Sequence, residues 1–77
     1  MSGEVLQSVC RLAYRCARLY RTEAAAIATS LPDRAAYLRV RADDHLRRAR
    51  AQRERLRELG FVDREIEDLE SEVSRER

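Results

Sequence analysis

Residues that end helices are rare in this 77-residue chain, which contains a single proline and two glycines. The proline lies in the stretch Ser30-Leu31-Pro32-Asp33, and Gly60 marks a second break. The segments between the breaks have the periodicity of amphipathic helices, and none has the alternation that is typical of a strand. The pattern predicts an all-α protein with one domain (residues 1–77) and helices over about residues 4–29, 33–59 and 63–74. We expect a long antiparallel hairpin with a short acidic third helix beside it.

The residues at the two breaks are suited to helix ends. Ser30 can cap the second helix, and Pro32 suits its first turn, where no backbone N–H is needed. Gly60 is expected to end the second helix in the left-handed conformation, with Phe61 packing back across that end. Asp63 is expected to cap the third helix.

The first predicted helix has a wide apolar face. At about 100° per residue, this face approaches half of the circumference, which is more than one neighbouring helix needs. A chain this short also buries only a thin core. We therefore expect oligomerisation or a partner to complete the fold. The centre of the face is Leu6, Val9, Ala13, Cys16, Tyr20, Ala24, Ile27 and Leu31, with Val5, Leu12 and Leu19 on one side, Cys10, Ala17 and Ala28 on the other, and Arg11, Arg15 and Arg18 opposite.

The second and third predicted helices have narrower apolar stripes. Small alanine side chains in the second helix would let the first helix approach closely. The third helix is apolar along one edge only, and acids occupy the rest of its surface. The two stripes are Ala35, Leu38, Ala42, Leu46, Ala49 and Leu56 in the second helix, and Val62, Ile66, Leu69 and Val73 at and within the third.

The charges are sorted along the chain. All sixteen residues counted as lysine or arginine are arginines. Residues 34–57 hold nine arginines against three acids, a net charge of +6, whereas residues 63–76 hold seven acids against two arginines, a net charge of −5. Because Gly60-Phe61-Val62 joins the arginine-rich helix to the acidic segment, we expect the third helix to fold back and screen the segment from Arg47 to Arg57.

Composition and spacing argue against several classes of protein. The net charge of +2 is too small to indicate nucleic-acid binding by itself, and no apolar run approaches the roughly 18 residues of a membrane span. Cys10 and Cys16 would lie about 120° apart around one helix and cannot bridge each other, which indicates a reduced, intracellular setting. We predict no catalytic residue, no cofactor and no metal, because the chain has no phosphate-binding loop, no metal-ligand spacing and no paired carboxylates.

One group of side chains resembles the metal-binding set of ferritin-like hairpins. Tyr20 and His45 are expected to lie at one level of the hairpin, with Glu23 near them. The Glu-x-x-His spacing of that family is missing, because Ala42 stands three residues before His45. A minimal or degenerate ferritin-like metal-binding protein is therefore one alternative.

The tripeptide Leu19-Tyr20-Arg21 resembles the motif that names the LYR-motif family of small, arginine-rich, three-helix proteins. In that family Leu-Leu-Arg usually follows the motif, where this chain has Glu23-Ala24-Ala25. The resemblance implies a mitochondrial accessory or assembly factor, often one that docks acyl carrier protein, with the tripeptide as its motif. Four residues of the second predicted helix lie at spacings similar to those of the family: Tyr37, Arg39, Arg41 and Leu46.

These patterns favour a non-catalytic adaptor, accessory or assembly protein that acts through its helical surfaces, either as a homo-oligomer or within a complex. An acidic protein is the partner expected for the arginine-rich segment. Binding of phosphate or nucleic acid by this segment is a second alternative, although no helix-turn-helix, zinc finger or aromatic platform accompanies it. The residues predicted to contact a partner are Leu19, Tyr20, Arg21, Arg47, Arg48, Arg50, Arg53, Arg55 and Arg57.

Overall fold

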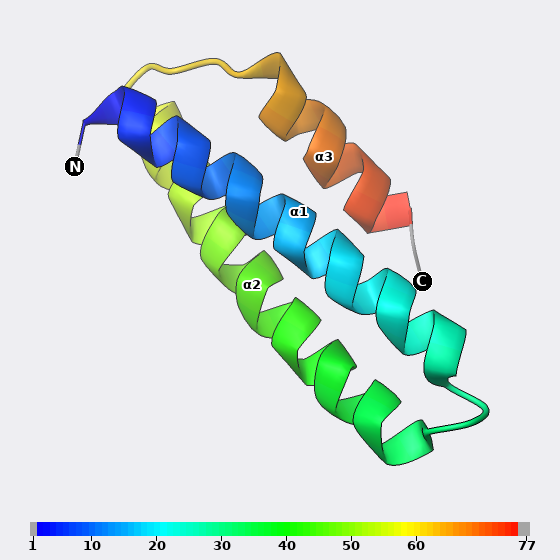
Figure 1. The fold of residues 1–77 in the computed structure, drawn as a ribbon. Helices are drawn as coiled ribbons and strands as arrows, with labels where there is room; N and C mark the ends of the chain where they lie inside the picture. The colour runs from blue at the N-terminus through cyan, green and yellow to red at the C-terminus, as the bar shows by residue number, and fades with distance from the viewer. Residues whose placement is uncertain (1, 76–77) are drawn as a thin grey trace.

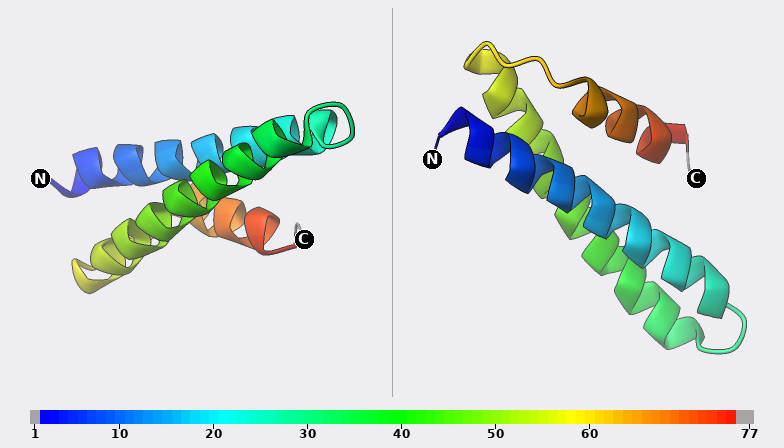
Figure 2. Two further views of the ribbon diagram at one scale, coloured as in Figure 1. Left: turned by 90° about the horizontal axis from the view of Figure 1, so that it is seen from below. Right: turned by 45° about the horizontal axis from the view of Figure 1, so that its top comes forward.

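The computed structural model describes residues 2–75 and contains three helices, α1 (Gly3–Ile27), α2 (Pro32–Glu58) and α3 (Arg64–Arg75) (Figure 1). α1 and α2 form a long antiparallel hairpin, and α3 lies beside it and runs in the same direction as α1 (Figures 1 and 2). The molecule measures 44 × 22 × 14 Å along its principal axes. The predicted all-α hairpin with a short third helix is confirmed. Glu76, which belongs to the predicted acidic segment, lies outside the described residues.

The turn between α1 and α2 differs in detail from the prediction. α1 ends at Ile27, two residues earlier than expected, and Leu31 rather than Ser30 immediately precedes α2. The prediction that Ser30 caps α2 is therefore wrong, and its hydroxyl instead donates to the carbonyl oxygen of Ile27 at 3.4 Å, within the end of α1. Pro32 occupies the first turn of α2 as predicted. Proline has no N–H, so one of the unpaired donors at the start of the helix is absent.

The connection between α2 and α3 follows the predicted geometry. Gly60 has a φ of 84°, in the left-handed region, and its N–H donates to the carbonyl oxygen of Arg57 at 3.0 Å. The N–H of Phe61 reaches back to the carbonyl oxygen of Leu56 at 2.9 Å, which completes a Schellman motif. The Phe61 ring then lies over Gly3, where an added Cβ would come within 2.0 Å of the ring. This contact ties the connection to the start of α1.

Small side chains at intervals of seven residues form the interface between α1 and α2. Because these side chains are short, the two backbones come close together. The thiol of Cys10 accordingly donates to the backbone carbonyl oxygen of Ala49 at 3.3 Å. The set is Cys10, Ala17 and Ala24 on α1, and Ala35, Ala42 and Ala49 on α2, all of them at most 1% exposed.

The main core lies where α3 covers one flank of this interface. Ile66, Leu69 and Val73 of α3 are at most 6% exposed and pack with residues of both other helices. Tyr14, which the sequence pattern left out of the apolar face of α1, is fully buried in this core. The buried arc of α1 is therefore turned toward Tyr14 relative to the prediction, because α3 packs on that side. The turn end of the hairpin has its own smaller core of Ala24, Ala35 and Leu38, with Tyr20, Ile27 and Ala28 packed against it.

The close-packed alanine interface predicts that a larger side chain destabilises the fold at a buried interface position but not at an exposed position of the same helix. Ala42→Leu should destabilise the fold by about 1–3 kcal/mol, because the extra atoms force the two helices apart. Ala51 lies on the exposed surface of the same helix, so Ala51→Leu should change the free energy of unfolding by about 0.5 kcal/mol or less. Urea denaturation followed by circular dichroism measures both. Equal stabilities of the two variants would contradict a close-packed interface.

The buried tyrosine predicts an unusual dependence on pH. Among the described residues, the Tyr14 hydroxyl is buried without a hydrogen-bond partner, and burial raises the pKa of Tyr14 to about 12, with Glu70 contributing. Between about pH 10 and 12 the unfolded chain releases this proton while the folded chain keeps it, so the wild type loses stability as pH rises.

Tyr14→Phe should remove the part of this loss of stability at high pH that the Tyr14 hydroxyl causes. At pH 7 the variant should be as stable as the wild type or more stable, since no buried donor is left unsatisfied. Urea midpoints at pH 7 and pH 11 give the measurement, with the exposed Tyr37→Phe as the control. A large destabilisation of Tyr14→Phe at pH 7 would indicate that the hydroxyl has a partner.

Candidate protein-binding face

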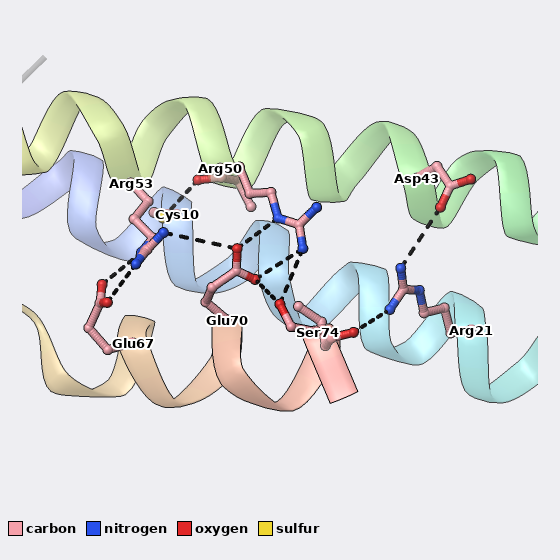
Figure 3. Close-up of polar contacts among 10 residues, drawn as sticks. Cys10, Arg21, Asp43, Arg50, Arg53, Glu67, Glu70 and Ser74 are labelled. Carbon is pink, nitrogen blue, oxygen red and sulfur yellow. Dashed lines mark hydrogen bonds and ion pairs between the residues drawn. The ribbon is translucent and has the colours of Figure 1, made fainter. Parts of the chain in front are cut away.

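The acids of α3 face arginines of α2, as the predicted fold-back requires. Arg50 donates to both carboxylate oxygens of Glu70 at 2.7 and 3.2 Å, and Arg53 donates to both oxygens of Glu67 at 2.7 Å (Figure 3). The hydrogen bonds from Arg53 hold the pKa of Glu67 below its usual value. Two-pronged pairs of this kind fix the orientation of the side chains. Arg50 and Arg53, both predicted partner contacts, are therefore occupied by the chain itself.

Other acids of the acidic segment, which begins at Asp63, pair with α1 rather than with α2. Asp63 accepts from Arg11 at 2.6 Å and also caps α3 by accepting the N–H of Ile66 at 3.1 Å, so its predicted capping role is confirmed. Further along, Glu65 lies 2.5 Å from Arg15, and Glu72 lies 2.7 Å from Arg18. The three arginines of α1 that were placed opposite the apolar face thus point toward α3.

The expected screening of the segment from Arg47 to Arg57 is incomplete. Arg47, Arg55 and Arg57 pair with acids of α2 itself, namely Asp44, Glu58 and Glu54. Arg48 forms no ion pair or hydrogen bond through its side chain with any described residue. α3 covers one side of this segment, and the arginines on the other side remain exposed.

The three residues of the Leu19-Tyr20-Arg21 tripeptide point in different directions. Leu19 is 70% exposed. Tyr20 stacks on His45, with ring centroids 5.3 Å apart, and the Arg41 guanidinium lies 5.9 Å from the centre of the Tyr20 ring. Arg21 donates to the carbonyl oxygen of Val73 at 2.9 Å and lies 3.9 Å from Asp43 (Figure 3). The tripeptide therefore does not form one surface, although Tyr20 and His45 do lie at one level as predicted.

Five apolar side chains of α1 form a line outside the core, which we call the apolar row. They follow one another at intervals of four, three, four and three residues, which is the spacing of a ridge that packs against another helix. Val5, Leu12 and Leu19, which the sequence placed along one side of the wide apolar face, are 50%, 59% and 70% exposed. The apolar row consists of Val5, Val9, Leu12, Cys16 and Leu19.

Three exposed arginines of α2, which we call the arginine row, lie on the same side of the hairpin as the apolar row. Contacts at the level of Tyr20 and Arg21 establish the two sides. Arg21 contacts Val73 of α3 and Asp43. The neighbouring Tyr20 lies on the other side of the hairpin, with the Arg41 guanidinium over its ring. Successive intervals of seven residues repeat nearly the same direction on a helix. The arginine row is therefore Arg41, Arg48 and Arg55.

Other kinds of site find little support in the described residues. Among residues 2–75, no group of three or more His, Cys, Asp or Glu side chains could hold a metal ion. Glu23 is exposed, and Ala42, which stands where a ferritin-like ligand would be expected, is part of the alanine interface. None of the described helices is long and apolar enough to cross a membrane.

A depression of about 240 Å³ lies where the connection to α3 meets the end of α2. Its charged lining groups are mostly engaged, since Arg53 holds Glu67 and Asp63 holds Arg11 and the start of α3. A ligand that used these charges would have to break contacts that fasten α3. The depression is therefore a weaker candidate for binding than the apolar row.

No protein-family model, no curated protein and no solved structure matches this chain. We therefore infer its function from the geometry of the described residues. Among these residues, the apolar row with its neighbouring arginines is an exposed apolar surface that no other helix covers. Periodicity placed its side chains on the wide apolar face of the first helix but did not indicate which part of that face stays exposed.

The two cysteines provide a test of which side chains this face presents. Cys10 is fully buried, and burial raises its pKa to about 11, whereas Cys16 lies half-buried in the apolar row. At pH 8 about one Cys10 thiol in a thousand would be ionised. A colorimetric thiol reagent should therefore modify Cys16 in a fast phase and Cys10 only slowly. Cys16→Ala should remove the fast phase and Cys10→Ala the slow one, and a single rate for both thiols would contradict this arrangement.

Proposed function

We propose that this protein is a non-catalytic adaptor that binds another protein through the apolar row of α1. Single exposed leucines are common on protein surfaces, but a contiguous apolar line points to an interaction site. The supporting observation is that Val5, Leu12 and Leu19 stay exposed at the spacing of a packing ridge while α3 covers the other flank of the same hairpin. Of the residues predicted from the sequence to contact a partner, only Leu19 belongs to the apolar row.

Alternative functions gain less from the same geometry. A ferritin-like metal protein would need a ligand cluster that the described residues do not provide. A binder of phosphate or nucleic acid would need free arginines grouped together, whereas Arg50 and Arg53 are held by carboxylates of α3. The LYR-motif resemblance stays a prediction, and with it the mitochondrial setting.

The test compares two exposed apolar residues, one in the apolar row and one outside it. Leu12→Asp places a carboxylate in the middle of the apolar row, and Val62→Asp places the same group on the connection to α3, where Val62 is 91% exposed. Both variants should keep the fold, with free energies of unfolding within about 0.5 kcal/mol of the wild type. Circular dichroism and urea denaturation check this first.

Each variant is then tagged, expressed in the organism that encodes it, and purified with its bound proteins. We expect a stoichiometric partner with the wild type and with Val62→Asp. At least tenfold less should be recovered with Leu12→Asp, because a carboxylate in a desolvated contact loses its hydration without a counter-charge. A partner that binds Leu12→Asp as well as the wild type would overturn the proposal.

A further inference from the structure

We propose that the apolar row and the arginine row together receive an acidic amphipathic α-helix of the partner protein. This inference rests on the proposed function and adds the chemistry of the partner. The hairpin would then hold one acidic helix on each side, its own α3 on one and the partner's helix on the other.

α3 shows what kind of helix fits against this hairpin. Its apolar ridge, Ile66, Leu69 and Val73, follows an interval of three and then four residues and is almost completely buried. Acids beside the ridge meet arginines of the hairpin, as in the two-pronged contact of Glu70 with Arg50. An apolar ridge with carboxylates beside it is therefore complementary to a hairpin flank that presents apolar side chains beside arginines.

The opposite flank presents the same combination without the carboxylates. Arg48 has no ion pair among the described residues. Arg41 lies over the Tyr20 ring, and Arg55 has only the exposed Glu58, three residues along its own helix at 3.2 Å. Cations at the edge of an apolar contact attract a partner of opposite charge and disfavour one of like charge. The arginine row therefore favours carboxylates on the helix that covers the apolar row.

A second copy of this chain is a poorer occupant of the face. The α1 helix of a second copy carries no Asp or Glu between Val5 and Leu19, so it would bring no carboxylate to the arginine row. The acid nearest to the row is Glu23, which follows it at its C-terminal end. The acids of α3 are engaged on the other side of the hairpin. Charge complementarity thus selects a different, acidic chain.

The length of the row sets the size of the partner helix. Val5 and Leu19 are 14 residues apart, so at 1.5 Å per residue the row extends over about 21 Å. The partner therefore needs about four helical turns with apolar residues at intervals of three and four, and with Asp or Glu on the side that faces α2.

The experiment uses the full chain and three labelled synthetic peptides, each a helix of about 18 residues with the same leucine ridge. The residues beside the ridge are all Glu, all Gln or all Arg. Fluorescence anisotropy at low salt should give a dissociation constant about tenfold lower for the Glu peptide than for the Gln peptide. The Glu peptide can form several exposed ion pairs with the arginine row, and each of them adds a small amount to the affinity. The Arg peptide should bind most weakly, and added salt should reduce the differences.

The arginine row is then neutralised in the variant Arg41→Gln/Arg48→Gln/Arg55→Gln. This variant should bind the Glu and Gln peptides with nearly equal affinity, while its affinity for the Gln peptide should match that of the wild type. A matched control removes three exposed arginines elsewhere and should keep the preference for Glu. The control is Arg39→Gln/Arg57→Gln/Arg64→Gln.

The possible outcomes separate this inference from the proposed function. Equal affinity of the wild type for the Glu and Gln peptides, with binding abolished by Leu12→Asp, would overturn the acidic partner and leave the binding face standing. Peptide binding unaffected by Leu12→Asp would overturn both. If no peptide binds, sedimentation velocity decides: a dimer that Leu12→Asp dissociates would assign the face to a second copy and overturn the acidic partner, and a monomer would overturn both proposals.

Discussion

The close contact between α1 and α2 along the alanine interface determines where most of the larger apolar side chains lie. Ala17, Ala42 and Ala49 are fully buried between the two helices, and at these positions no side chain of leucine size fits between the closely spaced backbones. Longer side chains must therefore lie on the two flanks of the interface. A two-helix hairpin of this kind has two apolar flanks and cannot cover either of them by itself. α3 covers one flank, and the apolar row is what remains on the other.

Electrostatic contacts explain why α3 covers the flank that it does. Exposed ion pairs contribute only about 0–1 kcal/mol each, so the buried ridge around Leu69 provides most of the attachment energy. Charges select the side, because Arg11, Arg15 and Arg18 border the Tyr14 flank and meet three acids of the segment. The opposite flank offers no such run of arginines on α1.

Much of this fold could be predicted from the sequence, because the breaks at Pro32 and Gly60 have local causes. Periodicity also predicted an apolar arc on α1 too wide for one neighbour. It could not predict which part of that arc is buried, because tertiary contacts decide which side of a helix is covered. Tyr14 was missed for this reason, and Leu19, which the pattern placed at one edge of the arc and among the predicted partner contacts, is 70% exposed. Segment charges likewise predicted that α3 folds back, but they carry no information on the pairing of individual residues.

Two separate roles of α2 explain why its arginines are distributed around the helix. A single binding surface would place its cations on one side, and the sequence shows no such side. In the structure Arg50 and Arg53 hold α3, whereas the arginine row, which includes Arg48, lies on the opposite side. A partner helix on that side would not compete with α3 for these charges. It would also stabilise the hairpin by mass action, since it binds only when α1 and α2 are folded together.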